Sequence, residues 1–243
     1  KQQQIPCILL NARLSEKSAK GYGKVRRLTQ PMLQQLTWLL AQDDATQQRY
    51  IDLGLDPNRS MVVGNIKFDI TAPVSFIEQA QQLKQDWQLA DRQIIVLAST
   101  HSPEEESLLK QIHSHLNSNP KLLCIVVPRH PERFDEVYKV CQNLNLNTQR
   151  RSLNQSIQVD TQVFLADSMG EMWLWYALSQ ACFVGGSLNE PGGGHNILEP
   201  MVLDVPTVIG PRYFNFQSIV DEFVSEKGIL VGENAEQVAQ QLL

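Results

Sequence analysis

The sequence lacks the features that define several protein classes. No apolar run approaches the roughly 20 residues that a membrane-spanning helix needs. The four cysteines are widely separated and contain no Cys-x-x-Cys pair, which favours buried thiols in a reducing compartment over disulfides or a zinc site. His113 and His115 are two apart in a predicted helix, so they face different ways and make poor metal ligands. The formal net charge of −5 argues against general nucleic-acid binding.

Three catalytic motifs are also absent. Without Gly-x-x-x-x-Gly-Lys-Ser/Thr the chain is not a P-loop ATPase, and without Gly-x-Ser-x-Gly it is not an α/β-hydrolase. The sequence also has no Asp-x-Asp, the pair with which metal-dependent glycosyltransferases hold a cation on a diphosphate. A glycosyl donor bound here would need helix N-termini and arginine to stabilise its leaving group.

The charge is uneven, and residues 13–27 are strongly basic. This segment holds six cations and one anion, Glu16, for a net charge of +5, so the rest of the chain carries −10. A solvated basic face is one interpretation, and a patch facing an acidic surface such as lipid phosphates is the other. The cations are Arg13, Lys17, Lys20, Lys24, Arg26 and Arg27.

Short apolar runs alternate with helical patterns along the chain. Such alternation predicts an α/β fold with a mostly parallel sheet and helices on both faces. We place a domain boundary after residue 66, giving domains 1–66 and 67–243, with a connection near 69–73. Both ends look cut, since the chain enters a strand almost at once after residue 1 and a helical pattern is still running at residue 243. Strands are expected at 5–10, 38–41, 61–63, 94–98, 122–127, 163–166, 181–184 and 206–209. Helices are expected at 25–36, 45–53, 76–87, from 103, 131–144, 169–178, 199–203, 216–224 and 235–243.

Polar turns follow five of the predicted strands. In a parallel sheet these turns meet at one edge, where α/β folds bind ligands. Residues 182–199 hold two glycine clusters before a helix, a pattern that offers backbone N–H groups to an anion. We therefore interpret this stretch as a phosphate- and sugar-binding turn. The other turns are 99–102, 128–131, 167–171 and 210–216.

Several residues in these turns have two interpretations. Ser168 and Glu171 form a capping box, yet the same helix start could bind a phosphate, and Gly170 there would permit close approach. Arg129 is either a surface residue or a bidentate phosphate ligand. Glu199, next to Pro200, is either a helix cap or an acceptor for ribose hydroxyls. His130 and His195 are either structural turn residues or acids and bases.

Six motifs occur along the chain in a fixed order. They are Asn11-Ala-Arg-Leu-Ser-x-x-Ser18, Gly64-Asn-Ile-Lys-Phe-Asp69, Pro128-Arg-His-Pro-Glu-Arg-Phe134, Asp167-Ser-Met-Gly-Glu171, Phe183-Val-Gly-Gly-Ser187 and Gly193-Gly-His-Asn-x-x-Glu-Pro200. Together they closely resemble 3-deoxy-D-manno-octulosonic acid (Kdo) transferase of Gram-negative bacteria, and the resemblance covers nearly the whole chain. It implies a GT-B glycosyltransferase with two Rossmann-like domains, which transfers Kdo from CMP-Kdo to the lipid A precursor (lipid IVA) in lipopolysaccharide biosynthesis. It implies inversion at the anomeric centre, no metal or other cofactor, and action at the cytoplasmic face of the inner membrane.

The resemblance also assigns roles to residues. Arg129 would contact the phosphate, 168–171 would face the nucleotide, and Glu199 would hold the ribose. Domain 67–243 would bind CMP-Kdo, and domain 1–66 would be the last part of the acceptor-side domain. The family's general base is absent, so we predict donor binding without turnover. The donor-side residues are Thr100, Arg129, His130, Ser168, Met169, Gly170, Glu171, Gly185, Gly186, Gly194, His195, Asn196 and Glu199. The acceptor-side residues are Arg13, Ser15, Lys17, Ser18 and Lys20.

Two alternatives stay open. The chain could belong to another GT-B enzyme, such as a UDP-sugar transferase or a sugar-nucleotide epimerase, which competition between CMP and UDP would reveal. It could also be a non-catalytic nucleotide-binding module, whose full-length form would not consume CMP-Kdo in the presence of acceptor lipid.

Overall fold

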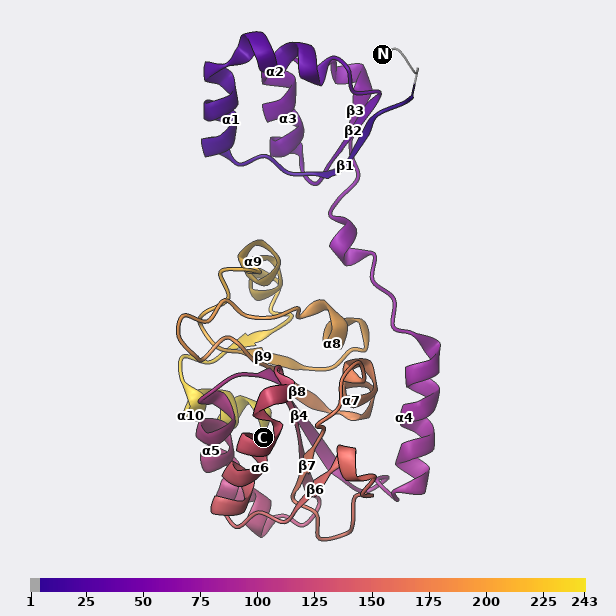
Figure 1. Ribbon diagram of the computed structural model, residues 1–243, viewed down its shortest axis with the longest axis vertical. Coiled ribbons are helices and arrows are strands. Elements are labelled where there is room, and N and C mark those ends of the chain that lie inside the picture. The colour runs from indigo at the N-terminus through magenta and orange to yellow at the C-terminus, as the bar shows by residue number, and fades with distance from the viewer. Residues whose placement is uncertain (1–4) are drawn as a thin grey trace. The chain divides into compact units, whose positions relative to one another are not determined.

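The structure, a computed structural model, describes residues 5–243. The chain divides into two compact units, Lys1–Ile70 and Thr71–Leu243, which are described separately (Figure 1). The predicted domain boundary after residue 66 falls inside the first unit, within a single 3₁₀ turn, η2 (Ile66–Phe68). The strand predicted at 5–10 is observed as β1 (Ile8–Ala12), and residues 1–4 lie outside the described residues.

The first unit is a three-stranded parallel sheet with three helices on one side of it (Figure 1). Leu39 and Ala41 in the central strand are fully buried, while Ile8, Trp38 and Met61 are 51%, 41% and 50% exposed. One face of this sheet therefore lacks a covering layer within the described residues. The strands are β1 (Ile8–Ala12), β2 (Trp38–Ala41) and β3 (Ser60–Val62). The helices are α1 (Glu16–Lys24), α2 (Arg26–Leu33) and α3 (Asp44–Asp52).

Much of the basic segment is itself a helix, which the apolar spacing did not predict. Two glycines, Gly21 and Gly23, and many charges obscure the pattern of α1. The start of α1 is defined by an N-cap, in which the Ser15 hydroxyl accepts a hydrogen bond from the Ser18 N–H at 3.2 Å. A side-chain acceptor at this position satisfies one of the free N–H groups of a helix.

The second unit is built on a seven-stranded sheet in which every pairing is parallel, in the order β10-β9-β8-β4-β5-β7-β6. Five strands were predicted from their apolar runs. The two edge strands were missed because β6 reads Thr-Gln-Arg, with no apolar residue, and β10 has only two residues. The strands are β4 (Gln93–Thr100), β5 (Leu122–Pro128), β6 (Thr148–Arg150), β7 (Val163–Leu165), β8 (Ala181–Val184), β9 (Thr207–Ile209) and β10 (Leu230–Val231).

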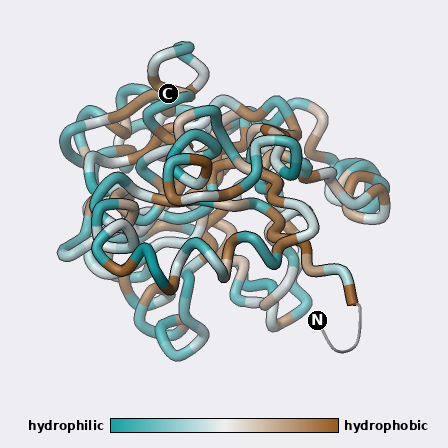
Figure 2. The backbone as a smooth tube through the Cα atoms, turned by 90° about the horizontal axis from the view of Figure 1, so that it is seen from above, coloured by the Kyte–Doolittle hydropathy of each residue, from teal (hydrophilic) through white to brown (hydrophobic). Residues whose placement is uncertain are grey.

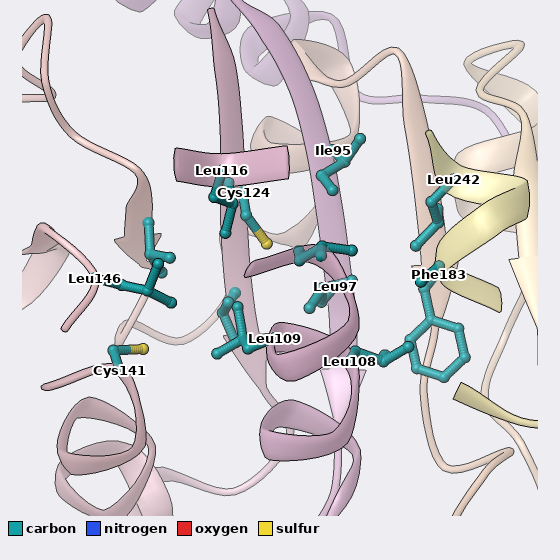
Figure 3. Close-up of a cluster of buried hydrophobic side chains, with 14 of the residues drawn as sticks. Ile95, Leu97, Leu108, Leu109, Leu116, Cys124, Cys141, Leu146, Phe183 and Leu242 are labelled. Carbon is teal, nitrogen blue, oxygen red and sulfur yellow. The ribbon is translucent and has the colours of Figure 1, made fainter. Parts of the chain in front are cut away.

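Helices cover both faces of this sheet, as the alternation predicts. Helices α5, α6 and α10 lie on one face, and α4, α7 and α8 lie on the other (Figure 1). Figure 3 shows the core under α5, where Leu108 and Leu109 pack beside Leu97 and Phe183. The helices are α4 (Val74–Asp86), α5 (Glu104–Ser118), α6 (Phe134–Asn143), α7 (Met172–Leu178), α8 (Leu198–Val202), α9 (Gln217–Ser225) and α10 (Ala235–Leu242).

The strand order places a topological switch point at the centre of the sheet. Strand β4 pairs with β5 on one side and with β8 on the other, so the chain builds outwards in both directions from β4. Ligands of open α/β sheets bind outside the carboxyl ends of the strands at such a point.

Hydrophobic and hydrophilic residues are interspersed along the chain (Figure 2). Among the described residues, no helix is both long and apolar enough to cross a membrane.

Candidate nucleotide site

A cavity of about 320 Å³ lies in the second unit at the carboxyl ends of β4, β5 and β7. It brings together Arg129, Gly170 and Asn196, which come from three separate turns. A site of this kind, at the switch point of a parallel sheet, suits a small ligand with an anionic group. The lining residues are Ser99, Val127, Pro128, Arg129, Ser168, Met169, Gly170, Glu171, Met172, Tyr176, His195, Asn196, Glu199 and Phe216.

A bulge at the end of β4 decides which of its side chains reaches the cavity. The register with β5 shifts between Ala98 and Thr100, and Ser99 has a left-handed backbone with φ of 51°. Ser99 lines the cavity, whereas the predicted Thr100 is fully buried and its hydroxyl has no partner among the described residues. Bulges commonly re-aim a side chain beside a functional site.

Arg129 follows β5 directly and is anchored through its backbone, whose N–H donates to the Thr100 carbonyl at 3.0 Å. Its side chain is exposed at the cavity wall, where a guanidinium can bind a phosphate through two parallel hydrogen bonds. His130 does not line the cavity. Its ring lies 5.0 Å from the ring of His101, and Nδ1 lies 3.8 Å from a Glu132 carboxylate oxygen.

The turn after β7 does not form the predicted capping box. Helix α7 begins at Met172, not at 169, and no side chain caps its start. The Ser168 hydroxyl donates instead to the Glu171 carboxylate, which also receives Arg151 Nη2 at 2.7 Å and Nε at 3.1 Å. Burial raises the pKa of Glu171, but these bonds and the Arg151 charge outweigh it and hold the pKa below its ordinary value.

Gly170 lies between Ser168 and Glu171 in this turn. Its φ is +83°, and a Cβ added there would meet nothing within 4 Å. The position therefore needs a glycine for its backbone conformation and faces open space at the cavity.

The Gly185-Gly186 turn is closed by a carboxylate from the protein itself. Glu104, which is 1% exposed, accepts hydrogen bonds from the N–H groups of Gly186, Ser187 and Leu188 at 2.8, 3.0 and 2.8 Å. These amides are the ones that we expected to face a phosphate. Neither Gly185 nor Gly186 lines the cavity.

The second glycine cluster brings His195 and Asn196 to the cavity. The Gly194 N–H donates to the Gly186 carbonyl at 2.7 Å, so Gly194 positions the loop without lining the cavity. The Asn196 side chain then donates to Glu199 at 3.3 Å, and its oxygen accepts from the Leu198 N–H at 3.2 Å.

Glu199 lies in the first turn of α8 and lines the cavity. Burial raises its pKa, and the hydrogen bond from Asn196 opposes this effect. Its carboxylate can both cap the helix and accept hydrogen bonds from sugar hydroxyls.

The predicted acceptor-side residues all lie in the first unit, around α1. Ser15 and Ser18 bond each other through their hydroxyls at 2.9 Å, and Lys20 forms an ion pair with Glu16 at 2.6 Å. These side chains, with Arg13 and Lys17, are exposed. The local contacts are those of a capped, solvated helix.

Several residues of the site escaped the sequence reasoning. Ser99, His101 and Glu104 follow or flank the polar 99–102 turn, so their position was visible, but nothing in the sequence separated them from Thr100. Arg151 lies after a short strand that left no pattern. Met172, Tyr176 and Phe216 read as ordinary helix residues. Among the described residues, no cluster of His, Cys, Asp or Glu has the arrangement of a metal site.

The fold places the chain in a broad structural class. UDP-GlcNAc 2-epimerase from Neisseria meningitidis superposes with a TM-score of 0.56 at 11% identity, covering 99% of this chain and 60% of that one. At this identity the likeness concerns the fold, which is the GT-B fold of glycosyltransferases and sugar-nucleotide epimerases.

Closer relatives narrow the class to a family. The family model for 3-deoxy-D-manno-octulosonic-acid transferase (kdotransferase) matches residues 1–70. The Haemophilus influenzae 3-deoxy-D-manno-octulosonic acid transferase is 40% identical over 94% of this chain and 53% of its own length. The C-terminal CMP-Kdo binding domain of WaaA from Acinetobacter baumannii is 66% identical, with a TM-score of 0.69, over 70% of this chain and 88% of that one.

The chain belongs to the Kdo transferase family, which confirms the resemblance seen in its motifs. It spans about half the length of the curated relatives it matches.

Proposed function

We propose that the second unit, Thr71–Leu243, binds CMP-Kdo for a Kdo transferase that glycosylates a lipid A precursor. The observation that carries the proposal is the 66% identity to a domain described as CMP-Kdo binding. The cavity suits that ligand, because it lies at the switch point and combines one exposed arginine with hydrogen-bond acceptors. The first unit, with its basic helix α1, then belongs to the acceptor side and approaches the inner-membrane surface at its cytoplasmic face.

Different residues of this cavity bind different parts of the ligand. Arg129 binds the phosphate that links CMP to the sugar and stabilises the charge that develops on it as CMP departs. Glu199, held by Asn196, accepts hydrogen bonds from the ribose hydroxyls. The turn 168–171 packs against the nucleotide, where Gly170 leaves room for close approach. Transfer inverts the anomeric centre and uses no metal, in keeping with the missing Asp-x-Asp motif.

Isothermal titration calorimetry with CMP tests the donor site on the 243-residue chain. Arg129→Ala should weaken CMP binding roughly 10- to 100-fold, because a charge-assisted hydrogen bond contributes about 1.5–3 kcal/mol. Arg13→Ala, an exposed arginine of the first unit, is the matched control and should leave the affinity unchanged. Equal CMP affinity in Arg129→Ala and the wild type would remove Arg129 from the site.

A competition assay separates this donor from UDP-sugar donors. CMP should displace a fluorescent nucleotide probe more effectively than UDP, and a preference for UDP would point to a UDP-sugar enzyme. With acceptor lipid present, we expect the 243-residue chain, which spans about half the length of its curated relatives, to bind CMP-Kdo without consuming it. Turnover by this chain would overturn that part of the proposal.

A further inference from the structure

Three imidazoles meet beside the cavity, from three different turns. His101 follows β4, His130 follows β5, and His195 lies in the loop before α8. The Nε2 atoms of His101 and His195 lie 2.8 Å apart, and the two rings stack at 5.0 Å with 13° between their planes. His195 lines the cavity, whereas His101 lies behind it.

The geometry of this pair limits its charge. An Nε2–Nε2 hydrogen bond requires one ring to donate its proton and the other to accept with a lone pair. The donating ring, when neutral, has an unprotonated Nδ1 that can take a second proton without breaking the bond. Protonating both rings would direct two N–H groups at each other across 2.8 Å. The pair can therefore be neutral or carry one positive charge, but not two.

The surroundings disfavour a positive charge on the pair. Burial lowers the pKa of His195 to about 4, and His101, Arg129 and His130 add to the effect. Burial and then His130 also lower the pKa of His101, with Arg133 and Arg129 acting the same way.

Two carboxylates of α5 lie close to His101 and act against the pKa-lowering effect of Arg129 and Arg133. The charge of Glu105 raises the pKa of His101, although Glu105 is committed to an ion pair with Arg133 at 2.7 Å. Glu104 accepts a hydrogen bond from the His101 backbone N–H at 2.8 Å. Glu105 thus balances Arg133, whereas Arg129 forms no ion pair among the described residues. An anion bound beside Arg129 would offset its charge and lower the cost of adding one proton to the histidine pair.

We propose that His101 is a positioning residue that holds His195 at the cavity wall, and that the pair takes up one proton when a phosphate-bearing anion binds beside Arg129. The proton comes from solvent and forms one N–H bond at the free Nδ1 of the donating ring. No other bond changes. The inference rests on the proposed function, since it takes a cytidine monophosphate group as the anion.

Calorimetry on the 243-residue chain measures the proton uptake on CMP binding directly. CMP is titrated at about pH 7 in PIPES and in Tris, whose ionisation heats differ, so the difference in observed heat counts the protons taken up. We expect an uptake approaching one proton, and an affinity about three- to tenfold higher near pH 6.5 than near pH 7.5. Across that range CMP itself changes little, because the second pKa of a phosphate is about 6.

Variants test the proton uptake and the positioning role of His101 separately. Because either ring can be the donor, only the double variant His101→Gln/His195→Gln should abolish the proton uptake. His101→Phe keeps a stacked ring but no nitrogen, and should weaken CMP binding roughly tenfold, while His101→Gln, whose amide can bond His195, should recover most of the affinity. His115→Gln, on the exposed face of α5, is the control and should match the wild type.

The outcomes are distinct from a failure of the donor site. Wild-type chain that binds CMP with the same heat in both buffers overturns the proton uptake, as does uptake that persists in the double variant His101→Gln/His195→Gln. Wild-type affinity in His101→Phe overturns the positioning role. Absence of CMP binding in the wild type overturns the proposed function and this inference with it.

Discussion

Two turns of the second unit look alike in the sequence and differ in what their amides bind. Both follow an apolar strand and both contain glycine with positive φ, at Gly170 after β7 and at Gly186 after β8. Around Gly170 the turn opens onto the cavity. Around Gly186 three consecutive N–H groups point at the carboxylate of Glu104. A glycine turn therefore signals exposed amides, and only the fold decides whether a ligand or a buried side chain binds them.

The largest expected effect comes from opening the closed turn. Glu104→Gln keeps the shape but offers one oxygen to four backbone donors, including the His101 N–H. At least two buried N–H groups would then face an amide NH₂, which should cost about 2–4 kcal/mol of unfolding free energy. Urea unfolding followed by tryptophan fluorescence measures this, because Trp87, Trp173 and Trp175 all lie in this unit.

Glu106→Gln is the matched control for this prediction. Glu106 is two residues away on the same helix, and its ion pair with Lys110 is half exposed. Exposed pairs of this kind contribute about 0–1 kcal/mol. Similar unfolding curves for Glu104→Gln and Glu106→Gln would contradict a role for Glu104 in closing the turn.

The sequence predicted the sheet well and the site only in part. The apolar runs of β4, β5, β7, β8 and β9 located the turns, because a parallel sheet forces those turns to one edge. Arg129, Ser168, Gly170, Asn196 and Glu199 were found in this way, and all line the cavity.

What the sequence did not reveal depends on contacts between distant segments. Glu104 lies 82 residues before Gly186, and His101 lies 94 residues before His195. No local pattern encodes these pairings. The bulge at Ser99, which turns Thr100 into the core, depends in the same way on the register between β4 and β5.

Alanine at the two glycine turns sharpens the comparison with a smaller effect. A Cβ at Gly185 would lie 2.6 Å from the Ser99 carbonyl and 2.7 Å from a Glu104 carboxylate oxygen, so Gly185→Ala should destabilise the unit by about 1–3 kcal/mol through overpacking. A Cβ at Gly170 would meet no atom within 4 Å. Gly170→Ala should therefore lower the free energy of unfolding by only about 1 kcal/mol, the cost of a left-handed backbone at a non-glycine residue. Urea unfolding of both variants gives the order, and a greater loss for Gly170→Ala would break the contrast between a closed and an open turn.

The smallest effect concerns the open turn, where Arg151 neutralises Glu171. Because the folded-state pKa of Glu171 is lowered, the ionised carboxylate stabilises the unit above its ordinary pKa of about 4.5, and this contribution is lost as the pH falls through the folded-state value. Arg151→Gln should therefore lower the free energy of unfolding by about 1 kcal/mol near pH 7 and by less near pH 4, measured by urea unfolding at both pH values.

Arg151→Gln should also weaken CMP binding a few-fold, since an unpaired carboxylate then faces the anion. Lys110→Gln, which breaks an exposed ion pair outside the cavity, is the control and should change neither the pH dependence of the unfolding free energy nor the CMP affinity. A loss in Arg151→Gln that is independent of pH would show that its guanidinium acts by packing on the Trp175 ring, 5.7 Å away, and not through the charge of Glu171.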